Sequence, residues 1–193
     1  ENNDSTSLAL FYRDIYSFDN VAGSAVDIQS SFPFSDWELR GLDDRELKIF
    51  NDGLERLNLR ELLPQLSTSY LVDGFYAGSL VFDAKAKNFM DVLTHDAIQC
   101  TMTPTGFNNV DPELHVTVSG GMSQFLNSAS PYSQKYLETM PLSLQELLRQ
   151  GAFTLDPVTT LFVARRALTD RAYMSYLHRI LPMYLIEKTM FRG

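Results

Sequence analysis

The stretch from Leu62 to Asp83, LLPQLSTSYLVDGFYAGSLVFD, constrains the fold most strongly because its hydrophobic period changes midway. Its first half places apolar residues three or four positions apart, as in an amphipathic helix, whereas its second half alternates like a strand. Gly74 and Gly78 mark the join between the two patterns. A helix that passes directly into a strand predicts a domain of the α+β class.

Helical spacing recurs on both sides of this join. The apolar positions from Leu8 to Ile28 form one stripe, which predicts a continuous helix of about six turns. Gly23 and its small neighbours would let another element approach that helix closely. Pro33 is expected to end it, because proline lacks an N–H and favours an extended residue before it. A further helix is predicted over residues 42–57.

Shorter alternating stretches predict strands over residues 37–41, 78–83, 89–93, 97–103, 115–118 and 158–164. A long closing helix is expected from Asp170 toward Arg192, with a kink at Pro182 because proline breaks the helical hydrogen-bond ladder. The predicted architecture is α+β, with several amphipathic helices around a small mixed or antiparallel sheet. We expect a domain over residues 1–169 and a helical extension over residues 170–193.

Charge and composition exclude several classes of protein. The chain has 193 residues and a formal net charge of −8, so its surface should repel the backbone of nucleic acids. We therefore expect no sequence-specific binding of nucleic acid. No run of about 18 apolar residues is present, and no membrane partner is expected. Cys100 is the only cysteine and cannot form an intrachain disulfide, so we interpret it as a small buried side chain.

The charge is unevenly distributed along the chain. Residues 160–193 carry six basic residues against two acidic ones, although the whole chain is acidic. This asymmetry predicts that the tail contacts an acidic surface on a sister subunit or elsewhere, unless it is a solvated basic helix face. The candidate subunit or channel contacts are Arg165, Arg171, Arg179, Lys188 and Arg192.

Residues that could carry chemistry are few and scattered. His95, Asp96 and His115 could supply three metal ligands, but sequence neighbours point apart on a strand. Asp83 and Asp91 flank a hairpin, where acids are usually turn formers. We therefore expect no enzyme activity, no cofactor and no metal. A hydrolase built around Asp83, Asp91 and His95 stays an alternative that would require turnover lost in Asp91→Ala.

The order of several segments resembles the portal proteins of tailed bacteriophages. The resemblance rests on YRDIY over residues 12–16, VAGSAVDIQSSFPF over 21–34, the join ending at Asp83, LTHDAIQCTMTP over 93–104, and the stretch from Phe153 to Gly193. By this resemblance the chain is a wing region followed by the start of a stem helix, truncated before the clip and crown. The join between helix and strand would then pack a wing helix beside the small sheet of the wing.

The resemblance implies a structural function. A portal ring, usually of twelve subunits, occupies one capsid vertex and lets double-stranded DNA pass without sequence specificity during packaging and ejection. Its expected partners are identical subunits, the major capsid protein, the packaging terminase and the tail connector. The expected location is the virion, after assembly in the host cytoplasm. The alternative is a cytosolic adaptor domain that binds a protein partner without catalysis.

Overall fold

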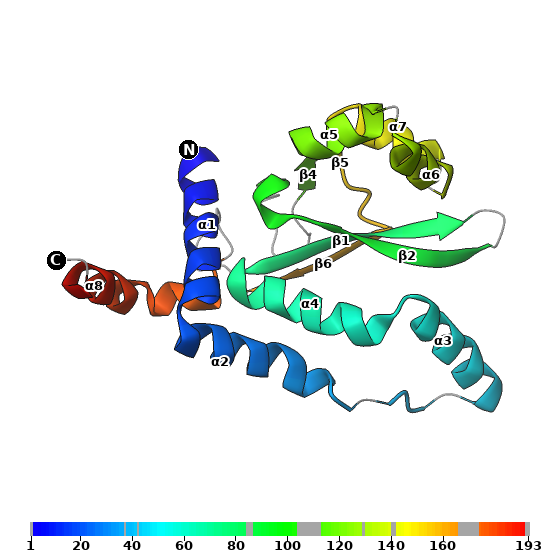
Figure 1. Ribbon diagram of the computed structural model, residues 1–193. Helices are drawn as coiled ribbons and strands as arrows, with labels where there is room; N and C mark the ends of the chain where they lie inside the picture. Colours follow the sequence, from blue (N-terminus) through cyan, green and yellow to red (C-terminus); the bar gives the residue numbers. More distant parts are fainter. Residues whose placement is uncertain are drawn as a thin grey trace.

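The computed structural model describes residues 2–36, 38–41, 43–83, 87–103, 113–128, 130–139, 142–165 and 174–191. Helices occupy both ends of the chain, and two three-stranded antiparallel sheets lie between them in sequence (Figure 1). The predicted α+β class is confirmed.

The N-terminal region forms two helices, α1 (Asn2–Phe18) and α2 (Asn20–Ser31). The prediction of one continuous helix was wrong, because Asp19 adopts an extended conformation between them. Its carboxylate accepts hydrogen bonds from the N–H groups of Val21 and Ala22, both at 2.9 Å, and thereby caps α2. The spacing of the apolar residues does not reveal this cap. The cap follows from the preference of aspartate for helix starts over helix interiors.

Gly23 is where α2 approaches α1. A Cβ atom at this position would lie 2.6 Å from the backbone oxygen of Tyr16, which confirms the predicted close approach. Gly23→Ala is expected to destabilise the fold by about 1–2 kcal/mol, because the overlap outweighs the better helix propensity of alanine. Gly53→Ala in α3 (Asp44–Arg56) is the matched control: no atom lies within 4 Å of its Cβ position. The free energy of unfolding of Gly53→Ala, measured by urea unfolding, should rise by up to about 1 kcal/mol. An equal rise in Gly23→Ala would contradict the packing argument.

Two helices precede the first sheet. Asp43 caps α3 by accepting from the N–H of Glu46, and α4 (Leu59–Val72) follows after one turn. A short 3-10 helix, η1 (Phe32–Phe34), follows α2 at Pro33. The strand predicted over residues 37–41 was wrong, because residues 38–41 have no strand pairing; Trp37 lies outside the described residues.

The first sheet has the order β2-β1-β6, with β1 (Phe75–Asp83) in the centre between β2 (Asn88–His95) and β6 (Thr160–Ala164). Gly74 has a φ of 89° and turns the chain from α4 into β1, as the change of period predicted. The second sheet has the order β3-β4-β5: Cys100–Thr103, Glu113–Thr117 and Ala152–Thr154. A 3-10 turn, η2 (Ala97–Gln99), links the two sheets.

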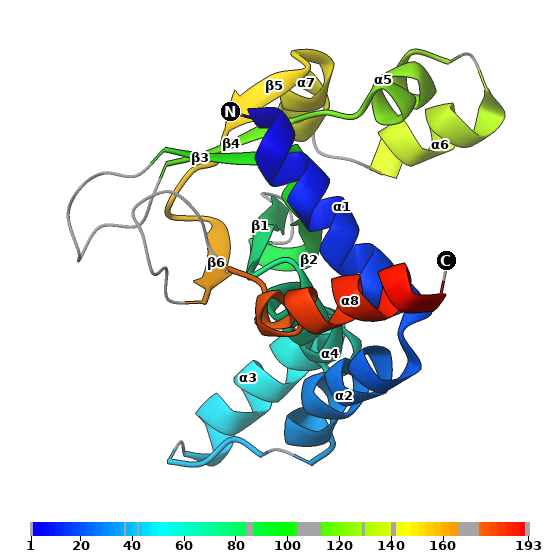
Figure 2. The ribbon, with the colours of Figure 1, turned by 90° about the vertical axis from the view of Figure 1, so that its left-hand side faces the viewer.

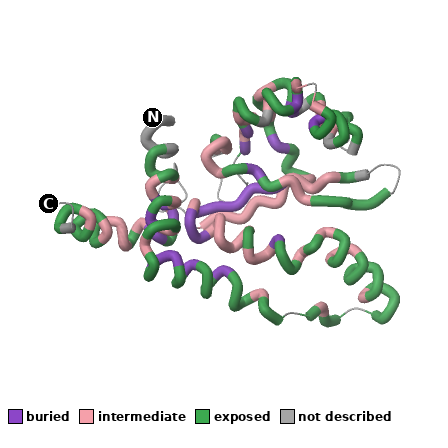
Figure 3. Tube along the Cα trace, viewed as in Figure 1, coloured by how far each residue is buried: buried purple, intermediate pink, exposed green. Residues whose placement is uncertain are grey.

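Three short helices follow β4 and lie beside the second sheet (Figure 1): α5 (Gly120–Asn127), α6 (Pro131–Thr139) and α7 (Leu142–Arg149). The interior is divided into two apolar clusters. The helical cluster joins α1, α2, α4 and the C-terminal segment, and the sheet cluster lies between the two sheets. The buried residues concentrate in these places, whereas α3 has no buried residue (Figure 3).

The closing helix is shorter than predicted. Residues 176–179 form a 3-10 helix, η3 (Tyr176–Arg179), and α8 begins only at Leu181 and ends at Phe191. Pro182 therefore lies in the first turn of α8 and not inside a long kinked helix, at a position where its missing N–H leaves no bond unmade. The expected start at Asp170 lies outside the described residues.

Candidate interaction surface

The C-terminal segment is fixed to the helical cluster before α8 begins. The hydroxyl of Ser175, which is 1% exposed, donates to the backbone oxygen of Leu71 at 3.2 Å and accepts from the N–H of Leu177 at 3.0 Å. Leu177 is also buried and belongs to the helical cluster. Residues 166–173 lie outside the described residues, yet the chain after them is anchored on α4 by both polar and apolar contacts.

One face of α8 packs on α1. Tyr12 on α1 hydrogen-bonds His178 of η3, and the rings of Phe11 and Tyr184 meet edge to face at 5.7 Å. The ammonium group of Lys188 lies 5.1 Å from the centre of the Tyr184 ring and 5.7 Å from that of Phe11. These contacts hold α8 against α1, as Figure 2 shows.

The opposite face of α8 has no covering element among the described residues. Met183, Ile186 and Met190 follow one another at spacings of three and four and are 74%, 58% and 76% exposed. We call these three residues the α8 ridge. Because the inner face is anchored, the ridge is a fixed apolar surface and not a flexible tail.

The five predicted contact residues have different positions. The guanidinium of Arg165 lies over the Tyr176 ring at 5.0 Å, and Lys188 lies over the rings of Phe11 and Tyr184, so both interact within their own chain. Arg179 is exposed in η3. Arg171 and Arg192 lie outside the described residues. The structure therefore places Arg165, Arg179 and Lys188 around the start and the inner face of α8, and the α8 ridge on its outer face.

His95 occupies a buried position between the two sheets. Its Nε2 lies 2.8 Å from the Ser79 hydroxyl, and its ring meets the Phe153 ring edge to face. Burial lowers the pKa of His95 to about 4. Ser79 lies on β1 and His95 on β2, so this hydrogen bond joins two neighbouring strands of the first sheet.

The other proposed ligands and acids have separate partners. Asp96 accepts from Arg13, His115 hydrogen-bonds Thr154, and the carboxylate of Asp91 accepts from the adjacent Val92 N–H. The Asp83 side chain lies outside the described residues. Across the part of the chain that the structure describes, no group of three His, Cys, Asp or Glu residues could hold a metal ion.

Cys100 and Asp91 have structural roles in this arrangement. The pKa of the Cys100 thiol is raised to about 12, mainly by burial and further by the charges of Asp96 and Asp73. The thiol therefore stays neutral and is a poor nucleophile at neutral pH.

Val92 pairs with Leu80, whose own N–H bonds to Thr159, so the Val92 N–H faces the free edge of the sheet. The Asp91 carboxylate accepts the hydrogen bond from this N–H, so the N–H is not available for pairing with another strand.

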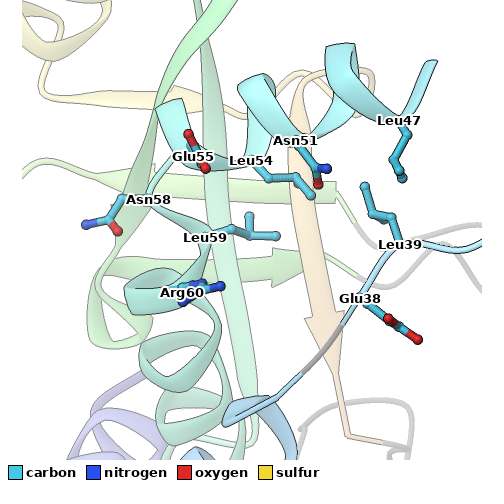
Figure 4. A pocket seen from close by; sticks show the side chains of 9 residues that line it. All are labelled: Glu38, Leu39, Leu47, Asn51, Leu54, Glu55, Asn58, Leu59 and Arg60. Atoms are coloured by element: carbon cyan, nitrogen blue, oxygen red, sulfur yellow. The ribbon is translucent and has the colours of Figure 1, made fainter. Parts of the chain in front are cut away.

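A surface pocket of about 590 Å³ lies between residues 38–39, α3 and the start of α4 (Figure 4). Four leucines line it together with carboxylates, amides and one guanidinium: Glu38, Leu39, Leu47, Asn51, Leu54, Glu55, Asn58, Leu59 and Arg60. Its described lining has no histidine, cysteine or serine.

Comparison with known proteins adds no assignment. No profile of a known protein family matches the chain, and no curated protein sequence matches it. Among the described helices, none is both long and apolar enough to span a bilayer.

The α8 ridge was not predicted from the sequence, because only the basic residues of this segment were predicted as contacts. Met183 and Met190 belong to a segment in which apolar residues occupy more than one helical face. Their spacing of seven, with Ile186 between them, is the signal that identifies one outward seam. What this arrangement can do is bind another apolar surface, since three large apolar side chains share one fixed face.

Proposed function

We propose that the chain is a non-enzymatic structural subunit of a portal-type ring in a tailed bacteriophage, in the region of the wing and the start of the stem. The observation that carries this proposal is the α8 ridge, because a rigid helix that exposes three large apolar side chains needs a partner surface. The order of the sequence segments that resemble portal proteins supports the choice of ring over other assemblies.

On this proposal identical subunits form the ring, usually of twelve copies, at one vertex of the virion. Double-stranded DNA passes through it without sequence readout, and the capsid protein, the terminase and the tail connector bind elsewhere on the ring. The net charge of −8 supports a role that does not require tight binding of DNA, because an acidic surface repels phosphates.

The oligomeric state of the chain tests this proposal. We expect a defined oligomer in sedimentation velocity and light scattering, and a shift to monomer in the double variant Met183→Ser/Ile186→Ser, because serine removes the apolar contact area of the ridge. The matched control is Val158→Ser, which removes an apolar side chain that is 86% exposed but lies before β6.

Two outcomes would contradict the proposal. One is a strict monomer at all concentrations and salt levels, which would favour the adaptor alternative if a distinct protein partner is then bound. The other is an oligomer that persists in Met183→Ser/Ile186→Ser as it does in the control Val158→Ser, since the ridge would then have no part in assembly. Circular dichroism of both variants shows whether the fold is retained.

A further inference from the structure

We propose that the α8 ridge of one copy binds to an exposed apolar face on α2 of a second copy, a contact that rests on the proposed assembly into a ring. This face consists of Val21, Ala25 and Ile28 on α2 and of Phe32 at the start of η1, and we call it the α2 face. Val21, Ile28 and Phe32 are 82%, 64% and 76% exposed, and Ala25 is exposed as well. The buried residues of α2 are Ala22, Gly23, Val26 and Ser30, which occupy the other side of the helix.

The spacing of the α2 face matches that of the α8 ridge. Residues of the α2 face follow one another at intervals of four, three and four, and those of the ridge at three and four. Intervals that alternate between three and four give a straight apolar seam along a helix, which is the pattern of helices that pack nearly parallel or antiparallel. Two such seams can interdigitate, and within the described part of a single chain no element covers either of them.

Charge selects α8 over a second α2 as the occupant. Residues 14–36 contain four aspartates and no lysine or arginine, whereas residues 160–193 carry a formal charge of +4. Two α2 faces brought together would place like charges side by side, but the basic tail meets an opposite charge. Lys188 lies against the rings of Phe11 and Tyr184 on the inner face, and Glu187 on α8 is exposed. The positive charge that this contact would use is therefore that of the exposed Arg179 together with the formal charge of the tail.

The geometry makes this contact one between copies. Both surfaces are exposed in the same chain, so neither covers the other; α8 lies beside α1, and α2 lies below α4 in Figure 1. A contact between two different surfaces is head to tail, and it closes into a ring or grows into a filament. The inference thus names the two surfaces that would propagate a ring.

Cysteine cross-linking between two singly substituted chains tests the contact. One variant carries Val21→Cys and the other Ile186→Cys, both in a Cys100→Ala background, and the two are mixed under mild oxidation. We expect a disulfide-linked dimer in the mixture and its loss in each variant alone. The yield should fall at high salt, because screening weakens the attraction between the acidic and basic segments.

The control replaces Val21→Cys by Val158→Cys, which is equally exposed but distant in sequence from α2, and this mixture should give no dimer. Dimers of Val21→Cys alone would overturn the proposal in favour of an α2–α2 contact, and dimers of Ile186→Cys alone in favour of an α8–α8 contact. An oligomer without cross-links in any sample overturns this contact and leaves the proposed function standing. A chain that stays monomeric overturns both.

Discussion

Replacing Arg13 by methionine is expected to lower the free energy of unfolding by about 3 kcal/mol. The guanidinium on α1 donates to both carboxylate oxygens of Asp73 at 2.9 and 3.0 Å and to Asp96 at 2.7 Å. The Asp73 side chain is only 6% exposed, so without Arg13 its charge would stay buried and unpaired. Hydrogen bonding to Asp73 raises the pKa of Arg13, which keeps the guanidinium charged.

Urea unfolding of Arg13→Met measures this loss. Arg40→Met is the matched control, because Arg40 pairs with Glu38 at a site where its side chain is 85% exposed, and the expected change is below about 0.5 kcal/mol. The double variant Arg13→Met/Asp73→Leu should recover most of the lost stability, since it removes the stranded carboxylate. Equal effects of Arg13→Met and Arg40→Met would show that the buried pair does not hold α1 to α4.

The sequence predicted the elements whose signals are local. The change of period before Gly74 located the join of α4 and β1, and Pro33 located the end of α2. In each case the backbone chemistry of a few neighbouring residues decides the structure, so no distant contact is needed to predict it.

The errors arose where a local cap or a distant contact outweighs periodicity. Asp19 divides a perfect apolar stripe because its carboxylate satisfies two N–H groups of α2. The chain around Ser175 leaves the helical pattern because its hydroxyl bonds to Leu71, which is more than 100 positions away in the sequence. Periodicity cannot reveal such a partner, and so the predicted long helix became η3 followed by α8.

The candidate interaction surface was predictable in charge but not in shape. The basic tail is visible in the sequence, yet Lys188 lies against aromatic rings of its own chain while Met183 and Met190 are exposed. The two apolar sides of α2 also cannot be separated from sequence, because which one is buried depends on the position of α4. Tertiary packing therefore decides which apolar residues form a core and which form an interface.

Acidification from pH 7 to pH 5 is expected to lower the free energy of unfolding by about 2 kcal/mol through His95 alone. Burial lowers its pKa from 6.5 to about 4 in the folded chain, so the unfolded chain binds the proton more readily. The stability is fully present above pH 6.5 and is lost as the pH falls toward 4. Protonation would place a charge beside Phe153 at a site only 8% exposed.

Urea unfolding at intervals between pH 7 and pH 5 separates this effect from the acids. Burial acts to raise the pKa of Asp96, but the hydrogen bonds from Arg13 and from the Ile98 N–H, together with the charge of Arg13, outweigh burial and lower the pKa from 3.8. The contribution of Asp96 is therefore lost only at more acid pH. His95→Gln can keep a hydrogen bond to Ser79 but cannot titrate, and it should flatten the profile. His115→Gln, at a side chain that is 40% exposed, is the matched histidine control. A slope that survives in His95→Gln would place the titrating group elsewhere and refute the burial argument for His95.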